Sequence, residues 1–274
     1  MKHCMAVIGY GGMGGWHVSN IQSRIETIHV KGVYDIRTEA QQKAKQEELY
    51  VYLSLEELLQ DDEVDLIVIA TPNNFHKDYA VKCLQAGKNV ISEKPVTMNA
   101  AELEEIMKAQ KESGKLFSVH QNRRWDKDFV IVDSILKKGE VGVPYFIESR
   151  VQGSRGAMYG WRGHRENGGG MTYDWGAHLI DQLLIMIDSP VVSVDAHLQS
   201  LYSDQVDDNI KIMLRFENGV SAICEMATNC LIRCPRWHVS CTDGTIVVDD
   251  FDCAGKIVRL KEDAEMEWTD DIVY

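Results

Sequence analysis

The sequence predicts an α/β protein of two unequal domains: an N-terminal Rossmann domain with a doubly wound parallel sheet, and a C-terminal α/β domain with an open, mainly antiparallel sheet. Its 274 residues exceed what a single hydrophobic core usually needs. The first 120 residues alternate short apolar runs with amphipathic stretches, which is typical of βαβ units. Strand-like segments dominate from residue 191 onward. We place the domains at residues 1–122 and 123–274.

The first domain is predicted to alternate strands and helices in order. Residues 5–8 form a buried strand, followed by a glycine turn and a helix to about residue 24. Residues 64–70 are the most apolar strand and are expected at the sheet centre. Ser54 and Glu57 form a capping box that opens a short helix. The other predicted elements are strands at 30–34, 89–92 and 116–120 and helices at 38–48, 74–85 and 99–113.

The second domain begins with a helix at 126–138, a strand at 145–151, a Gly- and Arg-rich loop at 153–170 and a helix at 172–187. Glu217-Asn218-Gly219 and Asp243-Gly244 are typical hairpin turns, so the strands around them are expected to run antiparallel. These strands are predicted at 191–201, 210–216, 220–227, 237–241 and 245–249.

Composition restricts the function classes. A chain with 45% hydrophobic and 26% charged residues is not disordered, and a net charge of −13 argues against a nucleic-acid partner. The apolar runs are too short to cross a membrane and no secretory cleavage pattern is present, so a cytoplasmic protein is expected. Seven cysteines without close Cys-x-x-Cys pairs predict neither a disulfide framework nor a structural zinc site.

A glycine-rich loop follows the first predicted strand. Residues 9–14 fit the pattern G-x-G-x-x-G, and the chemistry explains each glycine: Gly9 allows the tight turn, Gly11 lets the backbone approach a pyrophosphate, and Gly14 lets the helix pack closely. The helix N-terminus adds unpaired N–H groups and a positive dipole. We expect a dinucleotide to bind at Gly9, Gly11, Gly12, Met13 and Gly14.

Asp35 stands at the end of the second predicted strand, 21 residues beyond Gly14. A carboxylate there can accept both ribose hydroxyl protons and repels the 2′-phosphate of NADP, which favours NAD. Arg37 could offset that repulsion, so NADP stays open as a cofactor. The alternative for Asp35 is a solvated carboxylate at a strand end.

Two polar segments follow other strands, at the edge where open α/β sheets bind ligands. In Glu93-Lys94-Pro95 the proline fixes the turn, so Lys94 is expected to have a defined direction, although a lysine at a strand end is often simply solvated. The segment after residues 64–70 offers Thr71, Pro72, Asn73 and His76 as cofactor contacts, and an asparagine there could equally cap the next helix.

The predicted helix at 172–187 carries Asp174, His178 and Asp181 at i, i+4 and i+7, so the three side chains are expected on one helical face. An imidazole oriented by an aspartate is a suitable general base near neutral pH. Two alternatives remain open: a divalent metal site, and a hydrogen-bonded polar cluster at a domain seam.

Taken in chain order, these motifs resemble the Gfo/Idh/MocA oxidoreductases. The segments that carry the resemblance are the glycine loop with His17, Thr71-Pro72-Asn73 with His76, Glu93-Lys94-Pro95, Gln121-Asn122-Arg123-Arg124, and the run from Gly168-Gly169-Gly170 to Asp181. The resemblance implies sugar, inositol or other polyol substrates, with Lys94, Asp174 and His178 at the catalytic positions. It also implies a homodimer or homotetramer formed through the C-terminal sheet.

The expected function is therefore an NAD(P)-dependent dehydrogenase that moves a hydride between a carbohydrate or polyol hydroxyl and the dinucleotide. His178 would take the hydroxyl proton, Lys94 would stabilise the alkoxide and Asp174 would orient them. Further cofactor or pocket contacts are expected from Glu93, Gln121, Trp161 and Arg162. Two alternatives are an NAD-dependent redox-assisted glycoside hydrolase and a non-enzymatic sensor of dinucleotide or sugar. Members of the family that the motifs resemble usually continue past the last strand, so a chain ending at Tyr274 is expected to be either C-terminally truncated or a naturally shortened form.

Overall fold

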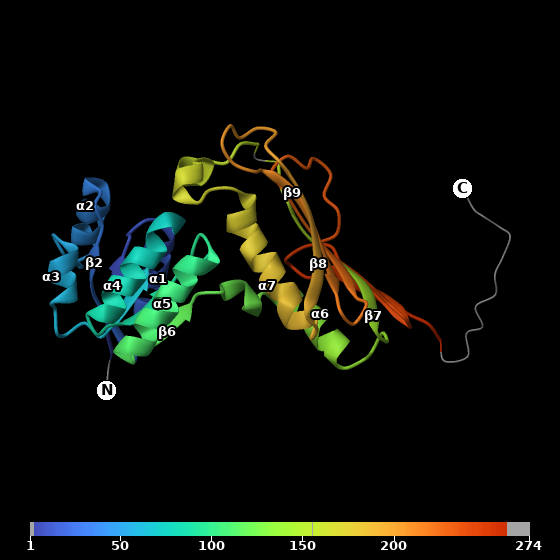
Figure 1. Ribbon diagram of the computed structural model, residues 1–274, viewed down its shortest axis with the longest axis horizontal. Coiled ribbons are helices and arrows are strands. Elements are labelled where there is room, and N and C mark those ends of the chain that lie inside the picture. Colours follow the sequence, from blue (N-terminus) through green and yellow to red (C-terminus); the bar gives the residue numbers. More distant parts are fainter. Residues whose placement is uncertain (1–2, 155, 262–274) are drawn as a thin grey trace. The chain divides into compact units, whose positions relative to one another are not determined.

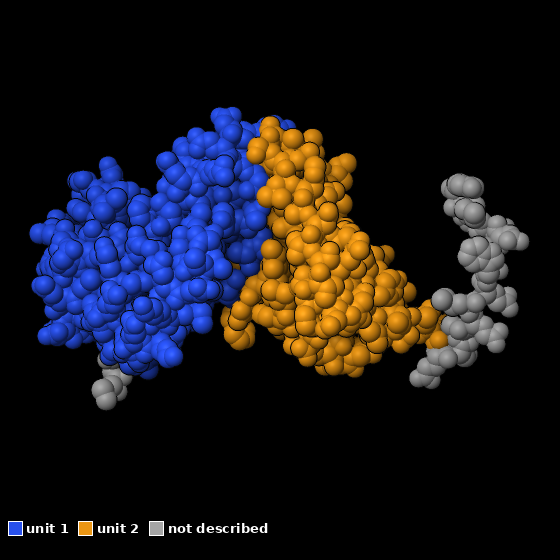
Figure 2. Space-filling view, in the orientation of Figure 1, with its two compact units in different colours: residues 1–121, 157–177, 202–207 blue, residues 122–156, 178–201, 208–274 orange. Residues whose placement is uncertain are grey.

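The computed structural model describes residues 3–154 and 156–261 and divides the chain into two units (Figure 2). The first unit combines most of the N-terminal half with two later segments, so covalent order alone does not define it. It comprises Met1–Gln121, Ala157–Ala177 and Tyr202–Asp207, and the second unit comprises Asn122–Gly156, His178–Leu201 and Asp208–Tyr274.

The first unit contains a six-stranded sheet in which every pair of neighbouring strands is parallel, in the order β3-β2-β1-β4-β5-β6. The strand order reverses at β1, and ligands of doubly wound sheets bind at such a reversal. The predicted doubly wound parallel sheet is confirmed. Its strands are β1 His3–Ile8, β2 Ile28–Tyr34, β3 Tyr50–Val51, β4 Leu66–Ile69, β5 Asn89–Ser92 and β6 Phe117–Val119.

Side-chain caps fix where some of the helices begin. Asn99 accepts a hydrogen bond from the backbone N–H of Glu102 at 3.0 Å, and Ser54 accepts one from Glu57 at 3.0 Å. The Glu57 carboxylate binds the N–H of Leu53, one residue earlier than the predicted capping box requires. The helices are α1 Gly12–Arg24, α2 Thr38–Gln46, α3 Leu55–Leu59, α4 His76–Gln85 and α5 Ala100–Ser113, with a short 3₁₀ turn, η1 Asn73–Phe75, before α4.

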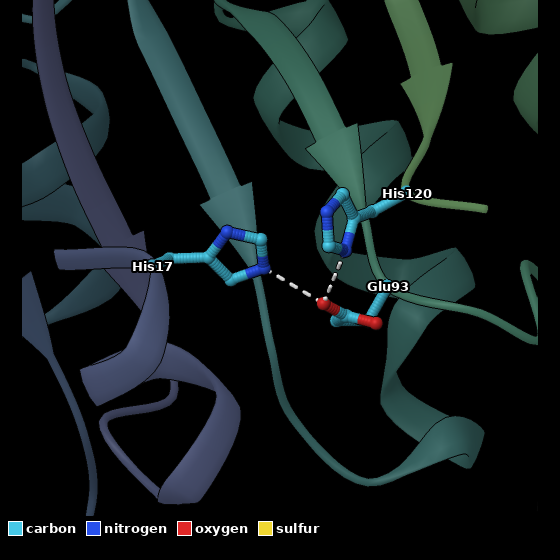
Figure 3. Close-up of side chains that lie close together, drawn as sticks. All are labelled: His17, Glu93 and His120. Atoms are coloured by element: carbon cyan, nitrogen blue, oxygen red, sulfur yellow. Dashed lines mark hydrogen bonds and ion pairs between the residues drawn. The ribbon is translucent and has the colours of Figure 1, made fainter. Parts of the chain in front are cut away.

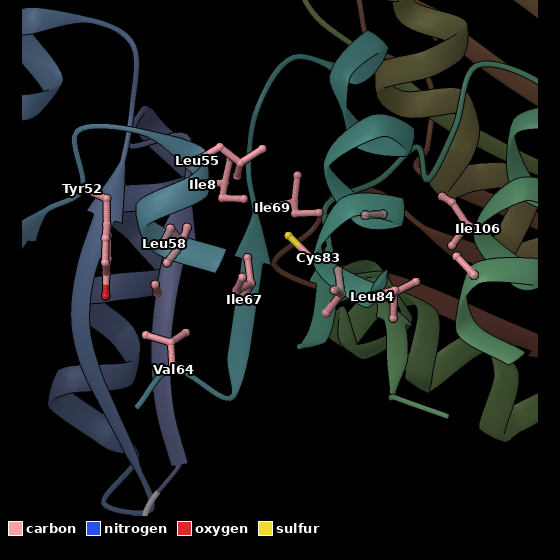
Figure 4. Packing of buried hydrophobic residues seen from close by; sticks show 14 residues of the cluster. Ile8, Tyr52, Leu55, Leu58, Val64, Ile67, Ile69, Cys83, Leu84 and Ile106 are labelled. Carbon is pink, nitrogen blue, oxygen red and sulfur yellow. The ribbon is translucent and has the colours of Figure 1, made fainter. Parts of the chain in front are cut away.

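Strand β4 is buried along its whole length because apolar side chains cover both faces of the sheet. On one face Ile67 and Ile69 pack with Leu58, Leu84 and Ile106, as Figure 4 shows. Burying each such side chain stabilises the fold by about 1.5–3 kcal/mol. The carboxyl ends of the strands therefore rest on a rigid core, which fixes the directions of the residues that follow them.

The second unit contains a seven-stranded sheet in the order β13-β12-β11-β7-β10-β9-β8. Its neighbours are antiparallel except β7 and β10, which confirms the predicted mainly antiparallel sheet. The wholly exposed edge strand β13 was not predicted. The strands are β7 Pro144–Gln152, β8 Val191–Gln199, β9 Asn209–Phe216, β10 Ser221–Ala227, β11 Trp237–Cys241, β12 Gly244–Val248 and β13 Gly255–Arg259.

Two helices accompany this sheet, α6 Lys127–Lys137 and α7 Ala177–Met186 (Figure 1). The predicted helix at 172–187 is not α-helical throughout, because Thr172–Gly176 forms a π-helical turn, η5. There the N–H of Ala177 binds the carbonyl of Thr172, five residues back. The wider turn changes the rotation per residue between Asp174 and Gly176, and the shared face of Asp174, His178 and Asp181 stays a prediction.

No helix in the described ranges 3–154 and 156–261 has the length and apolar character needed to span a bilayer. None of the seven cysteines, all within those ranges, forms a disulfide.

Candidate active site

The first unit contains a pocket of about 730 Å³ at the carboxyl ends of its central strands. The glycine loop, the ends of β2, β4 and β5, and residues of the 157–177 segment line it. Its lining includes most of the residues selected from the sequence: Gly9, Gly11, Gly12, Met13, Asp35, Arg37, Thr71, Pro72, Asn73, Glu93, Lys94, Trp161, Arg162 and Asp174. Sequence reasoning did not select Ile8, Tyr34, Ile36, Ala70, Phe75, Tyr79 and Tyr159, which also line it.

The glycine loop leaves room for an anion. Gly9 has φ +90°, and a Cβ there would lie 2.7 Å from the carbonyl oxygen of Ala70. A Cβ on Gly14 would lie 2.0 Å from the carbonyl oxygen of Gly9, so this glycine serves close packing. At Gly12, by contrast, a Cβ would meet no described atom within 4 Å. Because no side chain caps α1 at Gly11, the first N–H groups of α1 can bind a pyrophosphate there.

Asp35 follows β2 and lines the pocket. Its carboxylate accepts hydrogen bonds from the N–H of Tyr10 at 2.7 Å and from both the backbone and the guanidinium of Arg37 at 2.8–3.0 Å. Burial opposes ionisation, but these hydrogen bonds outweigh it and lower the pKa of Asp35. The Arg37 side chain is 56% exposed, so it has room to move when ribose hydroxyls take its place on the carboxylate. These residues fit an adenosine ribose.

An ion pair also lines the pocket. Lys94 Nζ donates to the backbone oxygen of Asp174 at 2.8 Å and to its Oδ1 at 2.9 Å, while Arg162 Nε donates to Oδ2 at 3.2 Å. Burial opposes the ionisation of Asp174, but the charges of Lys94 and Arg162 outweigh it and lower its pKa. A lysine ammonium has three N–H donors, so one is left for an oxygen in the pocket. The arrangement can stabilise a developing alkoxide.

Glu93, immediately before Lys94, is held by two histidines (Figure 3). His17 Nε2 lies 2.7 Å and His120 Nδ1 3.0 Å from the same carboxylate oxygen, Oε1. Burial opposes ionisation, but the hydrogen bonds from His120 and His17 outweigh it and lower the pKa of Glu93 to about 2. In the described part of the chain these three ligand atoms lie within 4.8 Å of one another, a donor set that could also hold a divalent cation. The two hydrogen bonds already bind the carboxylate, and they anchor the turn that carries Lys94.

Comparison with known proteins identifies the family. Residues 4–121 match the family model described as an oxidoreductase family with an NAD-binding Rossmann fold, and residues 129–247 match the Gfo/Idh/MocA C-terminal domain. The chain belongs to the Gfo/Idh/MocA family of oxidoreductases. The Rossmann domain that carries the glycine loop and Asp35 is thus the NAD-binding domain of this family.

Relatives span a range of similarity. Among solved structures, an NAD-binding protein from Listeria innocua superimposes with a TM-score of 0.92 at 44% identity, covering 94% of this chain and 77% of that one. Among curated proteins, scyllo-inositol 2-dehydrogenase (NADP(+)) IolW of Bacillus subtilis is 30% identical over 74% of this chain and 57% of its own length. An uncharacterised oxidoreductase of Schizosaccharomyces pombe is 34% identical over 65% of this chain and 50% of its own. The chain thus matches little more than half the length of these curated relatives.

Four of the catalytic and cofactor-binding residues selected from the sequence do not line the pocket, and one of them is Gly14, which serves close packing. His76 is fully buried, with Nδ1 2.8 Å from the carbonyl oxygen of Pro95 and Nε2 3.0 Å from that of Thr71, and it braces the two polar segments. Gln121 donates to the carbonyl oxygen of Ala177 at 3.1 Å. His178 is buried and is assigned to the second unit, as is Asp181, whose carboxylate binds Arg124 at 2.6–2.8 Å.

The sequence reasoning missed His120. It follows β6, the strand next to β5, and so stands at the same edge of the sheet as Glu93. The rule that selected the residues after β4 and β5 would have selected His120 as well.

Proposed function

We propose that this protein is an NAD(P)-dependent dehydrogenase that transfers a hydride between a carbohydrate or polyol hydroxyl and the dinucleotide. One observation carries the proposal: the glycine loop, Asp35 and the ion pair of Lys94 and Asp174 all line the same pocket. A site for the dinucleotide therefore adjoins a site for an alcohol.

The residues divide the proton chemistry among them. NAD, when bound, supplies the hydride acceptor. The remaining N–H of Lys94 donates to the substrate oxygen and stabilises its negative charge. Asp174, kept ionised by its two cations, holds that ammonium in place. His178 takes the hydroxyl proton as general base, a role that rests on its place four residues after Asp174 in the sequence and on the family resemblance.

The substrate class and the assembly belong to the same proposal. The name of IolW supports a cyclic polyol or sugar as substrate and keeps NADP open beside NAD. The exposed strand β8, with Val192, Val194 and Leu198 at least half exposed, supports a homodimer or homotetramer formed through the second sheet. The two family matches, which end at residue 121 and resume at 129, support a covalent domain boundary near residue 122.

A spectrophotometric screen tests the function. The protein is incubated with NAD or NADP and with inositols, hexoses, amino sugars or sugar acids, and the reduced cofactor is measured together with the oxidised product. We expect one reduced cofactor for each carbonyl product. His178→Ala should lower kcat strongly and leave NADH affinity close to that of the wild type. Hydrolysis of a glycoside without net NADH release would indicate the redox-assisted hydrolase, and ligand binding without any turnover would indicate a sensor.

A further inference from the structure

The position of Lys94 depends on the backbone of the π-helical turn η5. Its ammonium binds the main-chain oxygen of Asp174 as well as the carboxylate, at 2.8 and 2.9 Å. A rotation of the Asp174 side chain would move only one of these acceptors, whereas a change of the turn would move both. Whatever fixes the start of Thr172–Gly176 therefore fixes the ion pair.

Asp207, 35 residues from Thr172 in sequence, holds the start of that turn. Its Oδ2 accepts from the backbone N–H of Thr172 at 2.7 Å and from the hydroxyl of the same residue at 2.9 Å. Its main-chain oxygen accepts from the N–H of Met171 at 2.9 Å. Two N–H groups that the helix itself cannot pair at its N-terminus are thus satisfied by one residue, and a negative charge there suits the helix dipole.

The backbone before the turn is shaped to admit this carboxylate. Gly170 has φ +104°, and a Cβ on it would lie 2.4 Å from Oδ1 of Asp207. Only glycine accommodates both the conformation and the close approach. The last glycine of Gly168-Gly169-Gly170 therefore lets Asp207 approach the helix.

The neighbouring aspartate has a separate task. Asp208 is fully buried and accepts from the N–H of Leu201 and from Asn209 Nδ2, both at 2.9 Å, within the second unit. Other contacts hold the 202–207 segment in the first unit: Val206 is buried, and Ser203 Oγ accepts from the N–H of Met158 at 2.9 Å. The Asp207 carboxylate is therefore not the only anchor of its segment.

We propose that Asp207 is a positioning residue for catalysis: by capping the π-helical turn at Thr172 it sets Asp174, and through Asp174 the ammonium of Lys94, in the geometry that meets the substrate oxygen. This inference rests on the proposed dehydrogenase function. Asp207 itself touches neither substrate nor cofactor in this scheme. Its removal should change the chemical step rather than dinucleotide binding.

The test compares Asp207→Ala and Asp207→Asn with Asp204→Ala, an exposed aspartate of the same segment. Reduced-cofactor formation gives kcat and KM, cofactor fluorescence gives NADH affinity, and thermal unfolding gives the folded fraction. Asp207→Ala should lower kcat roughly 100-fold, the order of loss expected when a reacting group moves by about 1 Å. NADH affinity should stay near that of the wild type. Asp207→Asn, which keeps one acceptor oxygen, should be partly rescued, and Asp204→Ala should match the wild type.

A kcat of Asp207→Ala equal to that of the wild type, or an equal loss in Asp204→Ala, would overturn the proposal. If Asp207→Ala does not fold, Thr172→Val takes its place: it removes the hydroxyl donor to Oδ2 and should also lower kcat without weakening NADH binding.

A crystal structure of Asp207→Ala, or of Thr172→Val if Asp207→Ala does not fold, separates this inference from the proposed function. If the wild type reduces no cofactor with any substrate, the proposed function fails. The positioning claim is then decided by the Lys94 Nζ to Asp174 Oδ1 distance. A lengthened distance with an altered turn at Thr172–Gly176 supports the claim, and an unchanged turn and ion pair contradict it.

Discussion

Asp174 and Asp128, both in the described part of the chain, are carboxylates paired with cations, and they differ in what lies beside them. Asp174 in the first unit pairs with Lys94 and Arg162, its side chain is 22% exposed, and it lines the pocket. Asp128 in the second unit pairs with Arg236 at 3.1 Å, and their side chains are 0% and 2% exposed.

The second pair is enclosed by protein partners. Trp237 Nε1 donates to Asp128 at 2.8 Å, and the guanidinium of Arg236 donates to Ser149 at 2.5 Å and to Gln182 at 2.8 Å. Burial lowers the pKa of Arg236 to about 10, which measures how strongly this site disfavours an isolated charge. The comparison teaches that an ion pair enclosed among protein side chains has no access to a ligand, whereas one that lines a pocket can act on a ligand.

The largest effect is expected from Lys94→Met, because it removes the donor to the substrate oxygen. We expect kcat to fall about 10³-fold, because loss of one such donor lowers kcat by roughly 10²- to 10³-fold. NADH affinity should change little because the glycine loop and Asp35 are intact. Turnover and cofactor fluorescence measure the two quantities, and a variant that retains wild-type kcat would remove Lys94 from the chemistry.

The variants Asp128→Asn and Asp174→Asn test the comparison of the two ion pairs directly. Asp128→Asn leaves Arg236 buried without its counter-ion and should lower the free energy of unfolding by about 3–5 kcal/mol. Asp174→Asn should cost far less stability, because its cations are partly exposed, yet should lower kcat. Chemical denaturation and turnover of both variants give the four values. Equal stability losses would show that the pocket does not distinguish the two pairs.

The pH dependence of stability tests the support beneath Lys94. The pKa of Glu93 falls from an ordinary 4.5 to about 2 in the folded protein, so its contribution of about 3 kcal/mol is complete above pH 4.5 and is lost as pH falls toward 2. Glu93→Gln lacks this contribution. The difference in free energy of unfolding between wild type and variant should therefore shrink as the solution is acidified from pH 5 to about pH 2, and a constant difference would contradict the assignment.

The smallest effect is expected on the preference for NAD over NADP. Asp35→Ser removes the charge that repels a 2′-phosphate and leaves Arg37 free of its partner carboxylate. The ratio of kcat/KM for NAD to that for NADP should fall by roughly 10-fold or more, since a single charged contact is worth about 1.5–3 kcal/mol. An unchanged ratio would show that Asp35 does not determine the preference between the ribose hydroxyls of NAD and the 2′-phosphate of NADP.

Features set by neighbouring residues were predictable from the sequence. The glycine loop follows β1 directly, and Asp35 ends the next strand, so strand periodicity and spacing located both. The apolar run at β4 likewise located the sheet centre and the edge that carries the pocket.

Features assembled from distant segments were not predictable in the same way. Lys94 and Asp174 are 80 residues apart, and only the family resemblance connected them before the structure did. Asp207 is 35 residues from Thr172, so no local pattern in Thr172–Gly176 indicates that its carboxylate caps the π-helical turn. Strand β13 was missed because each of its residues is exposed and no alternation of apolar and polar faces marks it.

The most direct test is reduced-cofactor formation per folded molecule, measured side by side for wild type, Asp174→Asn and Asp128→Asn at a temperature where all three are folded. If the pocket of the first unit performs the hydride transfer, Asp174→Asn loses most of its turnover and Asp128→Asn retains that of the wild type. Wild-type turnover in Asp174→Asn, or an equal loss in both variants, would contradict this account.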